Sequence, residues 1–499
     1  MEYKSTRNSA LRVSSAQAIA QGISEDGGLF VPEHIPTLTN NDLKALCDMS
    51  YIERAESILM KYLSDFSLDE IKLCANGAYG GGKFDDDIPA PLSRLGESTY
   101  MLELWHGPTC AFKDMALQIL PYLLTVSAKK TISGKEVVIL VATSGDTGKA
   151  ALEGFKDVAG TRIMVFYPQD GVSEMQRLQM TTQEGDNVFV CAVKGNFDDC
   201  QREVKRIFTD KETVGKLSEN GLVFSSANSI NWGRLLPQIV YYISAYCDLV
   251  KDECIRFGDP INVVVPTGNF GNILAAYYAK RMGLPIKRFI CASNSNKILT
   301  DFIATGVYDT NRPFYTTISP SMDILISSNL ERLLYHLSED DDTYMTDCMT
   351  ALNESGRYEV KPEVINKLKE LFVGGHCDDE STKQTIRSLF DSYTYVADTH
   401  TAVAYKVYQD YVAKTKDETA TVIASTANAY KFPSSVYEAV SGIKEDASEF
   451  ALAQKLSQKT GTQVPASLKG LEQREARFDM CCDSNSMRDA VYNYLGINA

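Results

Sequence analysis

The sequence predicts an α/β protein with parallel strands and helices on both faces of the sheet, plus a mainly helical N-terminal domain. Three observations predict this fold class. From about residue 95 onwards, short apolar runs rich in Val and Ile alternate with helical stretches. These runs lack a polar face, which indicates strands buried on both sides of a parallel sheet. Before residue 95 the apolar residues follow a helical period instead.

Helical spacing marks the N-terminal region. Apolar residues recur with this period over Asn41–Met49 and Tyr51–Ser64. Turn signals interrupt the pattern at Asp26–Gly28 and at Gly80–Gly82. The tract Lys83–Leu92 contains three aspartates and two prolines, so we expect a linker there.

The α/β region then follows in order along the chain. Helices are expected over Thr147–Lys156 and Val172–Thr182, and another ends near Met282, just before Gly283. The strands expected between and after them are Glu136–Ala142, Arg162–Tyr167, Val188–Val193, Ile261–Val265, Phe289–Ala292 and Ala420–Ala424. We therefore divide the chain into an N-terminal domain (residues 1–95), an α/β region (96–450, with about 130–200 forming a smaller subdomain) and a helical C-terminal segment (451–499).

The charge balance excludes two classes of partner. The chain has 50 Lys and Arg residues against 65 Asp and Glu residues, a formal net charge of −15. Nucleic acids and anionic membranes are bound through clustered basic charge, so neither is expected as a partner. No apolar stretch reaches the about 18 residues of a transmembrane helix, and the N-terminal residues do not resemble a secretory signal.

The cysteines and histidines do not suggest a metal site. The 12 cysteines are scattered without a CxxC pair, and the five histidines are dispersed. Reduced thiols in a cytoplasmic enzyme are the expectation that follows. Cys110 is expected to be a small buried filler rather than a reactive thiol.

A lysine in apolar surroundings is the first candidate for chemistry. Lys113 lies in the segment HGPTCAFKD, at the start of an apolar helix. Burial lowers the pKa of a lysine, and a neutral amine attacks an aldehyde. The alternative interpretation is a lysine at a helix start whose aliphatic stem is buried while its ammonium group reaches solvent.

Two glycine-containing loops follow strands and open helices. Ser144–Gly148 (SGDTG) and Gly268–Asn272 (GNFGN) expose backbone N–H groups at a helix start, which suits a carboxylate or a phosphate. The first loop fails the P-loop pattern, because Thr143 and Ala150 occupy positions that need glycine and a hydroxyl. The second is not GxGxxG. Ordinary βα turns remain the alternative for both.

Two further segments combine short polar side chains. In Asn228–Arg234 (NSINWGR), Asn231 and Arg234 are three apart and would share a helical face. The planar guanidinium of arginine suits a phosphate or a carboxylate. Thr426 follows a buried strand, where a hydroxyl can hydrogen-bond a ring nitrogen. A helix cap with a surface arginine and a plain capping turn are the alternative interpretations.

In this order and combination, HGPTCAFKD, TSGDTG, NSINWGR and GNFGN resemble the threonine synthases, a fold-type-II pyridoxal-phosphate enzyme family with a tryptophan synthase β-like fold. The segments SSAQAIAQGISEDGGLFVPEHIP, KGNFDDCQ, TISPSMDILISSNLERL and DTHTAVAY are also similar to that family. The resemblance covers nearly the whole chain, with least support over Glu339–Ser392 and after about residue 450. One departure is Asn428–Ala429, where many members have His-Pro.

The resemblance implies pyridoxal 5'-phosphate as the cofactor and assigns roles to individual residues. Lys113 would be the catalytic lysine that carries the cofactor, and Thr426 would face the pyridine nitrogen. Asp146 would lie near the phenolic oxygen of the cofactor, and Phe112 beside it. The cofactor phosphate would be held by Gly268, Asn269, Phe270, Gly271 and Asn272. The substrate would be bound by Ser144, Thr147, Asn228, Ser229, Asn231 and Arg234.

The implied reaction converts O-phospho-L-homoserine and water into L-threonine and phosphate. A phospholyase that releases a keto acid could use the same loops, and only the products distinguish the two. A serine or threonine dehydratase would leave Arg234 without a phosphate to bind. A non-catalytic metabolite-binding protein would not need Lys113. We expect a monomer or a homodimer.

Overall fold

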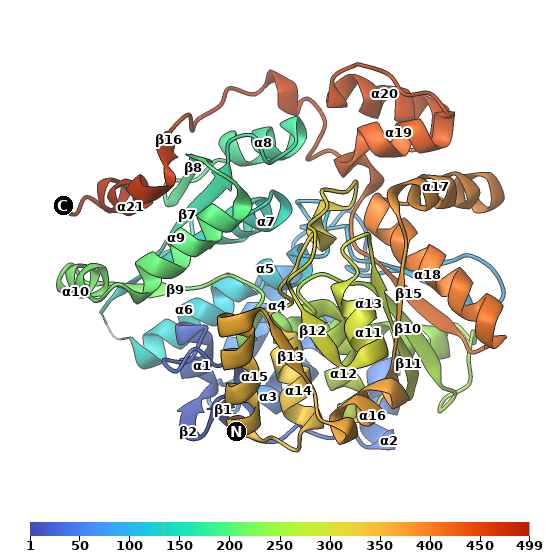
Figure 1. Ribbon diagram of the computed structural model, residues 1–499, viewed down its shortest axis with the longest axis horizontal. Coiled ribbons are helices and arrows are strands. Elements are labelled where there is room, and N and C mark those ends of the chain that lie inside the picture. Colours follow the sequence, from blue (N-terminus) through green and yellow to red (C-terminus); the bar gives the residue numbers. More distant parts are fainter. Residues whose placement is uncertain (133, 499) are drawn as a thin grey trace.

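The computed structural model describes residues 1–132 and 134–498 of the chain. Two parallel sheets form its α/β part (Figure 1). The larger has the strand order β14-β11-β10-β15-β5-β4, and only β4 runs antiparallel to its neighbour. Its strands are β4 (Leu92–Arg94), β5 (Thr99–Glu103), β10 (Ile261–Pro266), β11 (Ile286–Ser293), β14 (Phe372–His376) and β15 (Thr421–Ser425).

The smaller sheet has the order β16-β8-β7-β6-β9, and all its strands are parallel. One edge strand, β16, comes from the end of the chain and pairs with β8, so Cys481 lies opposite Ala192. In Figure 1 the C-terminal segment follows this sheet as far as helix α21. The strands are β6 (Glu136–Ala142), β7 (Thr161–Pro168), β8 (Val188–Lys194), β9 (Leu222–Ser225) and β16 (Cys481–Asp483).

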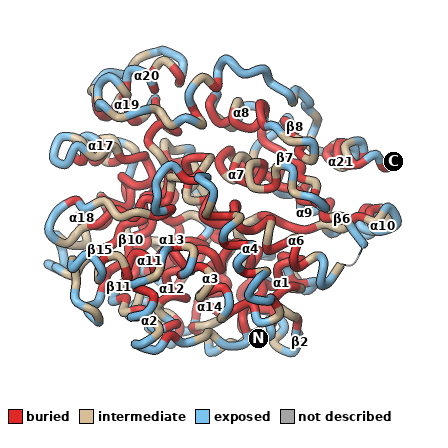
Figure 2. The backbone as a smooth tube through the Cα atoms, turned by 180° about the vertical axis from the view of Figure 1, so that it is seen from behind, coloured by how far each residue is buried: buried red, intermediate tan, exposed pale blue. Residues whose placement is uncertain are grey.

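The central strands form because their apolar residues can be buried on both faces. All residues of β10 are buried, as are all but the first residue of β6, and the tube in Figure 2 is coloured as buried along both. This pattern matches helices packed on each face of a parallel sheet. The α/β fold class predicted from the sequence is therefore confirmed.

Helices cover both sheets. Around the smaller sheet lie α7 (Asp146–Phe155), α8 (Glu174–Thr181), α9 (Phe197–Thr209), α10 (Lys211–Glu219) and α21 (Met487–Leu495). The larger half contains α5 (Asp114–Leu117), α6 (Leu120–Thr131), α11 (Trp232–Lys251), α12 (Gly271–Met282), α13 (Ile298–Thr305), α14 (Leu330–Leu337), α15 (Asp342–Ser355), α16 (Pro362–Leu371), α17 (Asp379–Tyr393), α18 (Thr399–Thr415), α19 (Pro433–Ser441) and α20 (Glu449–Thr460). A two-stranded ribbon, β12 (Val307–Asp309) with β13 (Arg357–Glu359), lies among them.

The N-terminal region contains the predicted helices and a small sheet that the sequence analysis did not identify. Its helices are α1 (Ser15–Gln21), α2 (Asn40–Cys47), α3 (Tyr51–Tyr62) and α4 (Leu68–Tyr79). Capping boxes at Thr39, Ser50 and Ser67 start the last three. The antiparallel sheet β2-β1-β3 is formed by β1 (Glu2–Ser5), β2 (Asn8–Ser14) and β3 (Phe30–Pro32).

Helix α11 joins the N-terminal region to the larger half. Its residues are buried on nearly every side, as expected for a helix that is apolar all round. At its first position, the Trp232 ring packs against the rings of Tyr3, Tyr62 and Tyr278 at centroid distances of 5.4, 5.5 and 5.4 Å. The N-terminus of this helix, which carries Arg234, is therefore held rigidly.

Candidate active site

The loop that carries Lys113 pairs with the loop that follows β15. Phe112 N–H donates to the carbonyl of Thr426 at 2.8 Å, and Asn428 N–H donates to the carbonyl of Cys110 at 3.0 Å. Ala111 and Ala427 form an antiparallel bridge between these two bonds. Because β15 ends at Ser425, Lys113 and Thr426 meet at the carboxyl end of the larger sheet, where ligands of parallel sheets bind.

The Lys113 ammonium is buried, with only 8% of the residue exposed. Its Nζ lies 3.6 Å from Asp146 Oδ2 and 3.4 Å from Ser321 Oγ. Burial lowers the pKa of Lys113, and the nearby charges of Arg234 and Lys431 lower it further, against the opposing effect of Asp146. This position favours the neutral amine that can act as a nucleophile or a base. The alternative of an ammonium in solvent does not fit this burial.

The TSGDTG loop brings a helix N-terminus to Lys113. The Thr143 hydroxyl accepts hydrogen bonds from Gly145 N–H (3.0 Å) and Gly148 N–H (2.8 Å), which holds the turn. Helix α7 begins at Asp146 with Gly145 as its cap residue, so the N–H groups of Asp146 and Thr147, which precede Gly148, are available to an anion. Ser144 and Thr147 are half-buried beside it.

The GNFGN loop is held closely against a neighbouring segment. A Cβ at Gly268 would lie 2.6 Å from the carbonyl oxygen of Ser321, so only glycine fits there. Ser327 Oγ donates to the carbonyl of Gly268 at 2.7 Å, and both N–H and Nδ2 of Asn329 donate to the carbonyl of Asn269 at 3.1 Å. These bonds fix the shape of the loop.

The helix that follows this loop starts with free donors. Phe270 precedes α12 in the left-handed conformation (φ 64°), and no side chain caps the helix. Asn272 Oδ1 accepts from Tyr242 Oη, whereas its buried Nδ2 has no hydrogen-bond partner among the described residues. A buried donor without a partner costs free energy, which a phosphate oxygen at this position would recover.

Arg234 is a buried cation next to these loops. The residue is 5% exposed, and its Nη1 donates to the carbonyl of Ala227 at 2.7 Å. Burial lowers the pKa of Arg234 to about 10, and no carboxylate among the described residues offsets that loss. The preceding loop approaches GNFGN, since a Cβ at Gly271 would lie 3.9 Å from the Cβ of Ser229. An anion in this region would stabilise the guanidinium.

Asn231 does not share a helical face with Arg234, because it is the cap of α11. Its Oδ1 accepts from Gly233 N–H, and its Nδ2 donates to the carbonyls of Ile19 (3.0 Å) and Ser226 (2.8 Å). Both hydrogens of the amide are used, so this side chain shapes the loop and offers no free donor. Asn228 and Ser229 remain half-buried in the same loop.

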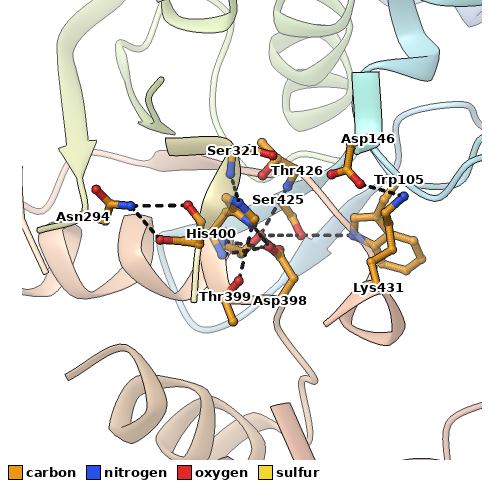
Figure 3. A network of polar contacts seen from close by, with 12 residues as sticks. Trp105, Asp146, Asn294, Ser321, Asp398, Thr399, His400, Ser425, Thr426 and Lys431 are labelled. Atoms are coloured by element: carbon orange, nitrogen blue, oxygen red, sulfur yellow. Dashed lines mark hydrogen bonds and ion pairs between the residues drawn. The ribbon is translucent and has the colours of Figure 1, made fainter. Parts of the chain in front are cut away.

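Figure 3 shows a polar network that the sequence analysis did not assign. It reaches Lys113 through Ser321, whose Oγ lies 3.4 Å from Lys113 Nζ. His400 Nε2 accepts from Ser321 N–H at 3.1 Å, and His400 Nδ1 lies 2.9 Å from Asp398 Oδ1. Asn294 Nδ2 donates to Ser319 Oγ at 3.1 Å and so secures the segment before Ser321. The segments TISPSMD and DTHTAVAY carry Ser319, Ser321, Asp398 and His400, but their spacing alone indicated no role.

A second lysine, Lys431, lies 3.0 Å from Asp146 Oδ1 and is 1% exposed. The sequence signal that could have indicated it is a lysine between Tyr430 and Phe432, directly after the Thr426 loop. Cys110 is buried and 3.2 Å from Ser467 Oγ, and burial raises the pKa of its thiol to about 11, which confirms that it is a filler.

Across residues 1–132 and 134–498, no three His, Cys, Asp or Glu side chains are grouped so as to hold a metal ion. Within the same ranges, no helix combines the length and apolar character needed to cross a bilayer.

Comparison with known proteins places the chain in a family. The family model described as "Pyridoxal-phosphate dependent enzyme" matches residues 87–426, and those of the threonine synthase N terminus and C-terminal region match residues 2–79 and 401–491. Threonine synthase of Pseudomonas aeruginosa is 38% identical over 88% of this chain and 90% of its own length. Human threonine synthase-like 1 is 42% identical over 86% of this chain, which spans 58% of that relative.

Solved structures agree with this assignment. The threonine synthase of yeast matches with a TM-score of 0.88 at 32% identity, and the PLP-bound threonine synthase of Brucella melitensis with 0.87 at 35% identity. Each match covers 99% of both chains. The fold is that of a fold-type-II pyridoxal-phosphate enzyme, and pyridoxal phosphate is the cofactor. The chain belongs to the threonine synthase family.

Proposed function

We propose that this enzyme converts O-phospho-L-homoserine and water into L-threonine and phosphate. One observation carries the proposal: a buried arginine without a carboxylate partner among the described residues, Arg234, lies near a buried lysine of lowered pKa, Lys113. A substrate with both a reactive amino-acid carbon and a phosphate would use both groups. An unphosphorylated substrate would leave the guanidinium uncompensated.

The residues at the site fit pyridoxal phosphate. The Nδ2 of Asn272, which has no partner in the described part of the chain, and the uncapped start of α12 suit its phosphate, together with the backbone of Gly268, Asn269, Phe270 and Gly271. Lys113 would carry the cofactor, with Phe112, Asp146 and Thr426 around the ring. When bound, the cofactor acts as an electron sink for carbanions at the substrate.

The side chains of this chain supply binding and proton transfer. Lys113 would move protons at Cα and Cβ of the substrate, because the amine that carries the cofactor would be left beside these carbons. Ser144, Thr147 and the start of α7 would bind the substrate carboxylate. Arg234, helped by Asn228 and Ser229, would stabilise the charge that develops on the departing phosphate. Asn231 would act by holding the shape of their loop.

The test is an assay of both products from O-phospho-L-homoserine. The purified protein should show a visible chromophore that borohydride removes, and phosphate and threonine should appear in equal amounts. Phosphate released together with a keto acid would replace this proposal with the phospholyase reaction. We also propose a cytoplasmic location and a monomer or homodimer, which fractionation and sedimentation would test.

A further inference from the structure

Lys431 is buried more completely than Lys113 and Arg234, and its three hydrogens are all used. It lies in the 3-10 turn Ala429–Lys431, just after the Thr426 loop. Its Nζ lies 3.0 Å from Asp146 Oδ1, 3.0 Å from the carbonyl of Thr109 and 3.2 Å from Gln179 Oε1. An ammonium group has three donors, so none remains for a substrate. Lys431 is therefore not a ligand-binding group.

The three partners of Lys431 belong to different parts of the fold. Asp146 begins α7 and Gln179 lies in α8, both beside the smaller sheet, whereas Thr109 precedes Lys113 on the side of the larger sheet. Figure 3 shows Lys431 reaching Asp146 from the turn after β15. Burying an ammonium is costly unless it is fully paired, so this residue holds the two halves together at one point.

Asp146 is held from two directions. Its Oδ1 is bound by Lys431 and by Gln176 Nε2 at 3.1 Å, and this leaves Oδ2 facing Lys113 at 3.6 Å. Although burial would raise the pKa of Asp146, the charges of Lys431 and Lys113 hold it well below its usual range. Asp146 therefore stays anionic between two lysines, only one of which is free to react.

We propose that Lys431 is a positioning residue: it fixes Asp146 so that one carboxylate oxygen faces Lys113, and it ties the smaller sheet to the larger one beside the reacting amine. This rests on the proposed function, in which Lys113 carries the cofactor. Lys431 touches neither substrate nor cofactor in this role. It acts through Asp146, so its loss should affect turnover much more than substrate binding.

The experiment compares wild type, Lys431→Met, Lys431→Arg and the matched control Lys4→Met, each as the full chain. Lys4 is also largely buried and pairs with Asp340 at 2.8 Å, away from Lys113. The first readout is the pH dependence of covalent attachment of pyridoxal phosphate, trapped with borohydride. Attachment needs the neutral amine, and loss of a nearby positive charge favours the ammonium form. The midpoint should rise by about one pH unit in Lys431→Met and stay unchanged in the other two variants.

The second readout is steady-state kinetics. Lys431→Met should lower kcat on the order of 100-fold with little change in KM, and the same substitution added to Asp146→Asn should cost little more. If Lys431→Met does not fold, Lys431→Gln takes its place. The positioning role would be overturned if Lys431→Met, or Lys431→Gln in its place, kept the wild-type pH midpoint of attachment and the wild-type kcat. It would also be overturned if the losses in kcat from Lys431→Met and Asp146→Asn were additive in the double variant. If the wild type attaches the cofactor but makes no threonine, the proposed reaction is overturned instead. The pH midpoints of cofactor attachment would still decide the role of Lys431.

Discussion

The backbone N–H of Ser321 points at Nε2 of His400 across 3.1 Å, and this determines which ring nitrogen is protonated. Since the N–H group is the donor, Nε2 must accept, so the His400 proton lies on Nδ1 and faces Asp398 at 2.9 Å. The His400–Asp398 pair is connected to the reactive amine through Ser321, because Ser321 Oγ is 3.4 Å from Lys113 Nζ. His400 thus holds the segment that faces Lys113.

Replacing His400 with Leu should both destabilise the protein and disturb the site. The half-buried Ser321 N–H would lose its acceptor, and the buried Oδ1 of Asp398 would keep only the backbone N–H of residue 400, which together cost about 2 kcal/mol of unfolding free energy. Chemical denaturation and turnover measure the two effects. Ser321→Ala is the matched control, because it keeps the backbone bond to His400. It should retain wild-type stability, and an equal loss in both variants would contradict this account.

Lys113→Ala should abolish the visible chromophore and turnover, because Lys431, the other amine beside Asp146, is fully paired. Absorbance after mixing with pyridoxal phosphate, and borohydride trapping followed by peptide mapping, measure this. Lys149→Ala is the control. Lys149 lies one turn into α7 and pairs with Glu153 at 2.9 Å, so its loss should leave the chromophore intact. An adduct that stays on another lysine would refute the assignment.

Arg234→Met should lower kcat/KM for the phosphorylated substrate on the order of 100-fold while the cofactor stays bound. The free protein should not lose stability, because the guanidinium is buried without a carboxylate partner among the described residues. Thermal unfolding with and without inorganic phosphate separates these effects: phosphate should raise the Tm of wild type and not that of the variant. An unchanged rate would remove Arg234 from the proposal.

Asn272→Ala should weaken the binding of pyridoxal phosphate about tenfold, because it removes a buried donor that has no partner among the described residues. Equilibrium titration of the cofactor-free protein by absorbance measures the affinity. Asn269 provides the comparison. Its side chain is exposed, and its backbone is what Asn329 holds, so Asn269→Ala should change the affinity much less. Equal losses in the two variants would contradict a specific role of the Asn272 amide.

The stability of the protein should depend on pH through His106. Burial alone would lower the pKa of His106, but the Asp85 and Glu103 carboxylates, at 2.6 and 3.0 Å, raise it to about 9. The unfolded value is about 6.5, so the stabilisation is complete below that pH and is lost as pH rises through about 9. Because Asp85 is exposed, we expect about 1–2 kcal/mol. The Tm difference between wild type and His106→Gln should shrink from pH 6 to pH 9.5, and a constant difference would contradict this.

Strands that are continuous apolar runs could be predicted from the sequence. Strands that contain polar residues or glycines could not. Glu136–Ala142 has the predicted bounds, because its Val and Ile residues leave only one interpretation. Strand β5 (TYMLE) is short and begins and ends with polar residues, and β14 (FVGGH) contains two glycines. Their neighbours in the sheet make them strands, and that information lies far away along the chain.

The candidate site shows the same division. Each loop was identified locally, but the pairing of Phe112 with Thr426 is a long-range contact that spacing does not encode. The expected linker Lys83–Leu92 is held in place by the bond of Asp85 to His106. Lys431 was overlooked because a single lysine between two aromatic residues is a weak sequence signal; its burial and its three partners reveal its importance.

The position of β15 in the larger sheet sets the order in which the enzyme can be assembled during synthesis. This strand lies between β10 and β5, yet it leaves the ribosome after both of them. A growing chain therefore holds two unpaired strand edges until residues 421–425 emerge, and such edges invite aggregation. The loop that pairs with the Lys113 segment directly follows this strand and is synthesised with it. Capture of the vitamin-derived cofactor must therefore occur late in the synthesis of the protein.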